Sequence, residues 1–223
     1  MLSAALVFGS CSKQDKDIAN NPLVKEWKTP FGTTPFEEIK PTDYLPAFKH
    51  AMKIHKEEVK AIIDNKETPN FQNTIAAFDF SGELLYKVAG VFFNMTAANT
   101  NEEMQKLEVE IAPMLAKHTD EINMDAKLFE KVKKVWDNKD KENLNQEQKM
   151  LLEKIYKRFV RSGALLSKDK QEELKKVNGE IKTYESKFSA NTLKETKSYE
   201  LIIDKKEDLK GLPQWLVDQA AST

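Results

Sequence analysis

The 223-residue chain has a composition that excludes several classes of protein before any element is assigned. Hydrophobic residues make up 40% and charged residues 32%, which is typical of a globular protein and not of a disordered chain. The formal net charge is −1, and Lys and Glu are mixed along the chain, so no basic stripe predicts nucleic-acid binding. The single cysteine, Cys11, excludes an internal disulfide framework.

Residues 1–20 are expected to form a signal-like segment followed by a tether. An apolar run leads to Gly9, Ser10 and then Cys11, which is the order at the end of a bacterial lipoprotein signal, where the cysteine is lipidated after cleavage. The alternative is a disordered apolar N-terminus with an incidental thiol, because no Lys or Arg precedes the run and a complete signal is longer. The run is too short to span a membrane.

The next segment, residues 21–48, is rich in proline and is expected to be an extended strap. Its prolines, at positions 22, 30, 35, 41 and 46, exclude a continuous helix before the last of them. Pro46 suits the first turn of a helix, and the apolar spacing predicts that this helix continues to about Asn65. Large apolar residues of the strap are expected to pack against the helices behind it: Trp27, Phe31, Phe36, Ile39 and Tyr44.

The most apolar stretch of the chain, Phe71–Ala98, is expected to be the central element of the fold. From Glu83 onward, apolar residues recur with helical spacing and cover nearly the whole circumference, which leaves only a narrow polar strip. A helix of this kind needs neighbours on most of its sides. A break in the stretch is expected near Ser81–Gly82.

Two helices are predicted in the following segment. Thr100 and Glu103 have the spacing of a capping box, in which each side chain satisfies a free backbone N–H group at the start of a helix. This helix is expected to end near Ile122 and to be kinked at Pro113. A shorter helix is predicted over residues 126–137 from its apolar spacing.

Two more helices are predicted between residues 145 and 191. Asn145 is expected to cap the first, which ends near Gly163. Ser167 begins a long helix whose apolar residues follow a strict 3, 4 spacing, which predicts a coiled-coil-like seam against one partner helix. The residues of this seam are Leu174, Val177, Ile181, Tyr184 and Phe188.

The elements together predict an all-α fold, a multi-helix array around a central apolar helix, with a short strand near the C-terminus. Tyr199–Asp204 is the strand candidate, and Trp215–Ala221 has the pattern of a helix beginning. The expected domain boundaries follow these changes of pattern. They are 1–20 for the signal-like segment and tether, 21–198 for the helical domain, and 199–223 for a strand and helix.

No catalytic or metal-ligating residue is predicted from the residues themselves. His50 and His55 are five positions apart and so point about 140° apart around a helix, and His55–Val59 reads HKEEV instead of the zinc-binding HExxH. His55 and His118 fall on apolar helix faces, which indicates packed histidines. Paired carboxylates on helix faces read as solvated charges, and no phosphate-binding glycine loop or nucleophile elbow occurs.

Several longer phrases of the sequence resemble one enzyme family. They are NPLVKEWKTPFGTTPFEEIKPTDYLPAF, GELLYKVAGVFFNMTAANTNEEMQKLEVEIAPMLAKHTDEI, LFEKVKKV, EQKMLLEKIYKRFVRSGALL and GLPQWLVDQA. In this order and spacing they resemble the N-terminal region of a peptidyl-dipeptidase, or dipeptidyl carboxypeptidase, of the thimet-oligopeptidase family of zinc metallopeptidases. The resemblance covers residues 21–221, nearly the whole chain.

The resemblance implies a large, nearly all-helical enzyme with a deep channel between two halves. It also implies that the C-terminal half carries an HExxH zinc helix, a further Glu ligand and the groups that hold the substrate's C-terminal carboxylate. None of these motifs is present in the 223 residues. Residues 21–198 are therefore expected to form one wall of the channel, and residues 199–223 to begin a connection to the catalytic half.

The expected function is that of the non-catalytic N-terminal portion of a zinc metallopeptidase that removes dipeptides from peptide C-termini when complete. The alternatives are an oligopeptidase of the same family, and a free-standing helical lipoprotein that serves as a binding or structural module. The expected partners are oligopeptide substrates and no nucleic acid, with zinc held by ligands outside this chain. Lipidation of Cys11 would place the protein in the bacterial cell envelope, in the periplasm or anchored to the outer membrane.

Overall fold

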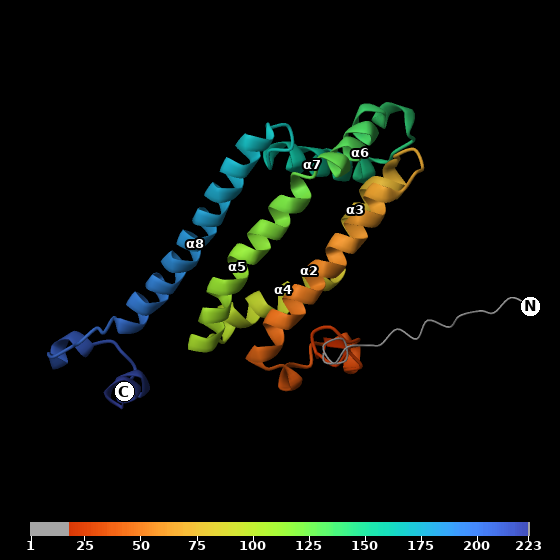
Figure 1. Cartoon of the computed structure of the whole chain (residues 1–223). Coiled ribbons are helices and arrows are strands. Elements are labelled where there is room, and N and C mark those ends of the chain that lie inside the picture. The colour runs from red at the N-terminus through yellow and green to blue at the C-terminus, as the bar shows by residue number, and fades with distance from the viewer. Residues whose placement is uncertain (1–17, 223) are drawn as a thin grey trace, which may run out of the picture. The chain divides into compact units, whose positions relative to one another are not determined.

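A computed structural model describes residues 18–222, so Cys11 and the signal-like segment around it lie outside the described residues. The described residues divide into two compact units, with the boundary between Lys187 and Phe188. Over the described residues the regular structure is helical and contains no strand, which confirms the predicted mainly α fold (Figure 1). None of the described helices is long and apolar enough to cross a membrane.

The helices follow one another along the chain with short connections. The first unit contains α2 (Pro41–Asp64), α3 (Ala77–Phe80), α4 (Glu83–Ala98), α5 (Glu102–Asn123), α6 (Ala126–Asp137) and α7 (Gln146–Arg161). A π-helical turn, Phe71–Ala76, leads directly into α3. The long helix α8 (Lys168–Ser198) begins in the first unit and ends in the second, which also contains α9 (Gln214–Ala221).

Helix α2 begins five residues earlier than its sequence pattern predicts. Pro41 occupies the first turn, and the Asp43 carboxylate accepts a hydrogen bond from the backbone N–H of Lys40 at 2.7 Å, which caps the helix. Pro46 therefore lies inside the helix. It removes only the bond to the carbonyl of Thr42, which is exposed at the start of the helix and open to water, so the cost of this proline is small.

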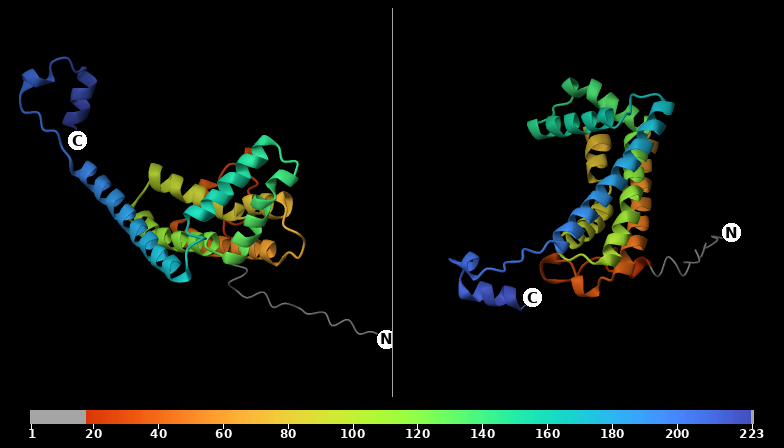
Figure 2. Two further views of the ribbon diagram at one scale, coloured as in Figure 1. Left: turned by 90° about the horizontal axis from the view of Figure 1, so that it is seen from above. Right: turned by 90° about the vertical axis from the view of Figure 1, so that its left-hand side faces the viewer.

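Helix α2 takes the central place that the sequence analysis assigned to Phe71–Ala98. It contacts α3, α4, α5 and α6, and its ribbon runs among the other helices of the first unit in Figures 1 and 2. Its residues belong to both hydrophobic cores of the first unit. The expected break at Ser81–Gly82 is present, but α4 beyond it is covered on one face only. Tyr86 is 84% exposed and Phe93 38%, so a nearly all-apolar helix does not have neighbours on most sides here.

The first core joins the N-terminal half of α2 to α4 and α5. Phe92 of α4 is fully buried and meets Tyr44 and Phe48 of α2 edge-on, with ring centroids 5.0 and 5.5 Å apart. Edge-to-face pairs of this kind add to the stabilisation from burial alone. The strap packs here as predicted through Trp27, Ile39 and Tyr44, whereas Phe31 (104% exposed) and Phe36 (55%) do not pack, contrary to expectation.

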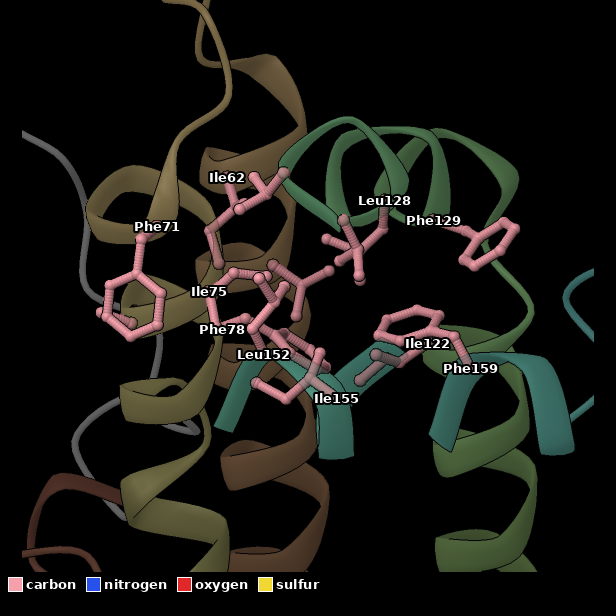
Figure 3. Packing of buried hydrophobic residues seen from close by; sticks show 14 residues of the cluster. Ile62, Phe71, Ile75, Phe78, Ile122, Leu128, Phe129, Leu152, Ile155 and Phe159 are labelled. Carbon is pink, nitrogen blue, oxygen red and sulfur yellow. The ribbon is translucent and has the colours of Figure 1, made fainter. Parts of the chain in front are cut away.

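The second core lies at the C-terminal end of α2, where α6 and α7 pack together. Phe159 of α7 is fully buried, with its ring 5.4 Å from Phe78 and 5.9 Å from Phe129. Figure 3 shows the labelled side chains of this core gathered between the helices: Ile62, Phe71, Ile75, Phe78, Ile122, Leu128, Phe129, Leu152, Ile155 and Phe159. The burial of these side chains stabilises the α6–α7 pair against α2.

Asparagine and aspartate side chains cap three helices of the first unit. Asn145 caps α7 as predicted, since its side chain accepts from the N–H of Gln148 at 2.9 Å. Asp125 caps α6. For α5 the expected cap, Thr100, is wrong by one residue, because the side chain of Asn101 accepts from Met104 N–H at 2.9 Å. Asn101 thus satisfies the N–H group of Met104, one position beyond the Glu103 N–H that Thr100 was expected to cap.

Helix α8 does not pack its seam against a partner helix, contrary to the prediction. No residue of α8 is buried, and Val177 and Ile181 are 44% and 46% exposed. The helix is attached to α5 through Asn178, whose side-chain amide donates to the carboxylate of Asp120 at 3.0 and 3.1 Å. The heptad spacing thus corresponds to an apolar stripe on α8 that no other helix covers among the described residues.

The second unit, residues 188–223, contains the end of α8, a short 3-10 turn at Lys206–Leu209 and α9. The strand expected at Tyr199–Asp204 does not form, because this segment has no regular structure in the described chain. Its run of apolar residues is exposed, with Leu201 at 71% and Ile202 at 74%. A strand needs a neighbour for its backbone hydrogen bonds, and the described residues offer none. The helix predicted near the C-terminus is confirmed as α9.

Candidate functional site

The first unit contains a pocket of about 620 Å³ where α2, α3, α4, α5 and α7 meet. Its lining combines apolar walls with a small group of polar and charged side chains, which is the usual character of a ligand site. The apolar walls are Phe78, Phe80, Leu85, Tyr86, Ala89 and Ile122. The polar lining is His55, Asp79, Ser81, Glu83, His118, Thr119, Asn123 and Arg158, with Gly82 between them.

The turn between α3 and α4 shapes one side of the pocket. Ser81 ends α3 by donating its hydroxyl proton to the carbonyl of Phe78 at 2.7 Å. Gly82 follows with φ 81° and ψ 15°, a left-handed conformation that glycine adopts at little cost. A Cβ at position 82 would lie 3.0 Å from the ring of His55, so the position needs glycine for space as well. The carboxylate of Glu58 accepts from Gly82 N–H at 2.7 Å and fixes the turn on α2.

His55 of α2 and His118 of α5 both line the pocket and form a pair. Nδ1 of His55 lies 3.0 Å from Nε2 of His118, and the ring centroids are 5.0 Å apart. On its other side, Nε2 of His55 lies 3.3 Å from the hydroxyl oxygen of Ser81. The pair therefore connects three elements that are far apart in the sequence.

The direction of the hydrogen bonds in this chain follows from the single proton of Ser81. Because that proton is donated to the Phe78 carbonyl, the Ser81 oxygen accepts from Nε2–H of His55. Nδ1 of His55 then carries no proton and accepts from Nε2–H of His118. Nδ1 of His118 is left as a buried acceptor without a partner among the described residues.

Burial lowers the pKa of both imidazoles. His118 is 4% exposed, and loss of solvent, followed by the proximity of His55 and Lys56, lowers its pKa to about 4, against the opposing effect of Glu121. The pKa of His55 is lowered as well, again chiefly by burial. The lowered pKa values favour the neutral form of both rings at pH 7, in which each imidazole has one N–H donor and one acceptor nitrogen for the N–H···N hydrogen bond.

Arg158 of α7 contributes a cation to the pocket. Its guanidinium lies over the ring of Phe78, 4.9 Å from the centroid, and makes no hydrogen bond or ion pair with any described residue. Loss of solvent lowers its pKa, while Tyr86 and Asp79 act in the opposite direction. Arg158 is thus a charged group held in place by an aromatic contact, with its five N–H donors free.

The Ser81–His55 contact does not have the arrangement of an activated nucleophile. A serine nucleophile donates its proton to the histidine that acts as base. Here the serine proton is directed to a backbone carbonyl and the imidazole donates to the serine oxygen. The hydrogen bonds therefore hold the turn and the two helices together and do not prepare Ser81 for attack.

The zinc implied by the family resemblance does not fit the residues of this pocket. Across residues 18–222 no group of three or more His, Cys, Asp or Glu side chains is placed to hold a metal ion. A zinc site needs three or four ligands, and the facing nitrogens of His55 and His118 are occupied by their shared hydrogen bond. The described part of the chain is thus not where we place a catalytic zinc.

The two histidines were predicted to be packed, and the structure confirms this for both. Sequence spacing did not show that they contact each other, because they are separated by 63 positions on different helices. It also gave no indication of Arg158. The available signals were a histidine on the apolar face of each helix and the Ser81–Gly82 break beside an aromatic cluster. Cys11, the predicted lipidation site, lies outside the described residues.

Known proteins similar to this chain are peptidases. The chain is 36% identical over 201 residues to the dipeptidyl carboxypeptidase of Escherichia coli, a match that covers 90% of the chain and 30% of that protein. The dipeptidyl carboxypeptidase of Salmonella typhimurium is 35% identical over 87% of the chain and 29% of its own length. Oligopeptidase A of Escherichia coli is 21% identical over 87% of the chain and 28% of its own length. No protein-family model matches the sequence.

The relatives described above are all peptidases, so peptidases are the class of protein to which the chain is related. Within that class, the chain is homologous to the dipeptidyl carboxypeptidases over about 90% of its length, and oligopeptidase A is a more distant relative. The resemblance predicted from the sequence is therefore confirmed. The chain spans about 30% of the length of the dipeptidyl carboxypeptidases it matches.

Proposed function

We propose that this chain is the helical, non-catalytic portion of a zinc metallopeptidase that releases dipeptides from the C-termini of oligopeptides. The observation that carries the proposal is the 36% identity to a dipeptidyl carboxypeptidase over 90% of the chain. The lower identity to oligopeptidase A, 21%, favours release of dipeptides over internal cleavage. The first unit supports the proposal as a helical body that presents a pocket of about 620 Å³.

The residues present indicate which part of the peptidase's function we assign to this chain. Hydrolytic zinc needs protein ligands and an open position for water, and the described residues provide no such group. We assign the zinc and the cleavage step to parts of a longer polypeptide, because the chain spans only 30% of the dipeptidyl carboxypeptidase that it resembles. The role of the present helices is to form one wall of the channel and to contact oligopeptide substrates.

The experiment that tests the proposal uses the native protein, captured from its source cells with an antibody against this chain. We expect a polypeptide roughly three times as long as the chain, consistent with the 30% coverage of the relatives, and zinc bound in a one-to-one ratio. It should release the C-terminal dipeptide from an N-blocked tetrapeptide, lose this activity on chelation and regain it with zinc. Products are identified by mass spectrometry.

A matched peptide distinguishes the two peptidase alternatives. The same tetrapeptide with a C-terminal amide lacks the free carboxylate, so a dipeptide-releasing enzyme should cleave it much more slowly than the acid. Equal cleavage of acid and amide would favour the oligopeptidase. A native protein no longer than this chain, without zinc or peptidase activity, would overturn the proposal and favour a helical binding module.

We further propose that the protein is attached to a membrane of the cell envelope through lipidated Cys11. The order of apolar run, Gly9, Ser10 and Cys11 supports this, and a multiply acylated cysteine anchors a protein stably. In the complete gene, Cys11→Ser should move the protein from the membrane fraction to the soluble fraction without loss of peptidase activity. Wild-type protein that is already in the soluble fraction would contradict the lipid anchor.

A further inference from the structure

We propose that the pocket between α2, α4, α5 and α7 binds a short zwitterionic peptide that carries an apolar side chain, of the class that a dipeptide-releasing peptidase produces. The source of the ligand rests on the proposed function. Its chemistry rests on the pocket itself, which offers a free cation, two free carboxylates and aromatic walls within one hollow. The volume of about 620 Å³ lies within the ~300–1,000 Å³ that is typical of small-ligand sites.

The guanidinium of Arg158 is the group that receives the ligand carboxylate. It lines the pocket, and within residues 18–222 it has no hydrogen-bond or ion-pair partner. The contact with Phe78 holds the planar group on an aromatic face and leaves its N–H donors available. Arginine binds a carboxylate with two parallel hydrogen bonds, which gives orientation as well as affinity.

The carboxylates of Asp79 and Glu83 are the groups that receive the ligand ammonium. Both line the pocket from either side of the Ser81–Gly82 turn, and both are exposed. Neither makes an ion pair or a side-chain hydrogen bond with a described residue, although Asp79 lies near enough to Arg158, and Glu83 near enough to Lys87, to act against burial and raise the pKa of each cation. A pocket lined by one cation and two carboxylates that form no ion pair with it matches a molecule with charges of opposite sign at its two ends.

Aromatic and aliphatic side chains provide the surface for an apolar side chain of the ligand. Phe80 is 77% exposed and Tyr86 84% exposed, and both belong to the pocket lining beside buried Phe78. Exposed aromatic side chains that gather at a concave site indicate binding, since covering them with an apolar group is favourable. His118, 4% exposed, also lines the pocket and adds its imidazole ring to this surface.

The binding test titrates dipeptides into the isotope-labelled 223-residue chain and follows the backbone amide resonances by NMR. Ala-Phe should shift the resonances of Ser81, Gly82 and Leu85 in a saturable manner. N-acetyl-Ala-Phe lacks the ammonium and Ala-Phe amide lacks the carboxylate, so each should bind about tenfold more weakly or worse. Gly-Gly keeps both charges but lacks the apolar side chain and should also bind more weakly.

Two variants of α7 test the role of the cation. Arg158→Gln should reduce the affinity for Ala-Phe at least about tenfold, because a charge-assisted pair is lost. Arg161→Gln is the matched control, since Arg161 is exposed on the same helix and does not line the pocket. Equal binding by Arg158→Gln and wild type, equal binding of Ala-Phe and its amide, or no shifts at the pocket would overturn the proposal.

The same titration separates this proposal from the proposed function. Binding is measured on the chain itself and does not depend on peptidase activity, so a native protein without dipeptide release would leave the NMR result intact. The longer native protein is then tested with the same dipeptides by calorimetry. Binding to the 223-residue chain but not to the longer protein would mean that another segment of the polypeptide covers the pocket, and this outcome would also overturn the proposal.

Discussion

Replacing Phe159 with alanine is expected to lower the free energy of unfolding by about 3–5 kcal/mol, the range for removal of a fully buried aromatic side chain. Phe159 has no exposed surface and is in contact with the rings of Phe78 and Phe129 from two other elements. Its loss removes apolar burial and leaves a cavity between α6, α7 and α3. Because interiors are close-packed, the surrounding helices can collapse only partly into that space.

The measurement is urea unfolding of the 223-residue chain at pH 7, followed by the far-ultraviolet circular dichroism of its helices. Phe188→Ala is the matched control, since it is the same chemical change at a side chain that is 73% exposed. The control should change the free energy of unfolding by less than about 0.5 kcal/mol. If the two variants were destabilised equally, the second core would not have the packing described here.

The bounds of helices that are defined by caps and glycines could be predicted from the sequence. The α6 helix matches its predicted bounds, and α7 begins after the predicted cap, Asn145. Its end is also encoded locally, because Gly163 adopts φ 92°, a conformation that glycine adopts at little cost. Caps and positive-φ glycines are properties of a few adjacent residues, so one sequence is sufficient to recognise them.

The sequence did not predict how many neighbouring helices cover each helix. The apolar circumference of α4 and the seam of α8 both predicted coverage that the described residues do not provide. An apolar stripe shows that burial is favourable but does not specify which residues supply it. Conversely, α2 looked like an ordinary amphipathic helix, yet it passes through both cores because each of its ends meets a different group of helices.

The candidate site could not be predicted from the sequence, because its residues come from elements that are distant along the chain. Its polar lining comes from α2, the α3–α4 turn, α5 and α7, and each of these contributes between one and three polar groups. No local motif marks such a set. The sequence could show that His55 and His118 lie on apolar faces, but their contact and the free guanidinium of Arg158 depend on how distant helices pack.

Acidification from pH 7 to pH 4.5 is expected to destabilise the chain through His118. The pKa of this imidazole is about 4 in the folded chain, below its ordinary value of 6.5. Below pH 6.5, His118 is therefore protonated in the unfolded chain but stays largely neutral in the folded chain. The free energy of unfolding decreases progressively as the pH falls toward 4. For His118 the loss at pH 4.5 is on the order of 2 kcal/mol.

His55 adds to this loss, because burial lowers its pKa in the same direction, while nearby Glu58 opposes and Arg158 reinforces the shift.

The contribution of His118 is isolated by comparison with His118→Gln, which cannot titrate. The stability of wild type relative to His118→Gln should decrease by on the order of 2 kcal/mol between pH 7 and pH 4.5, measured by urea unfolding at each pH. His50→Gln, on α2 but outside the pair, is the control and should follow wild type across the same range. A difference between wild type and His118→Gln that stays constant with pH would show that His118 is not held neutral by burial.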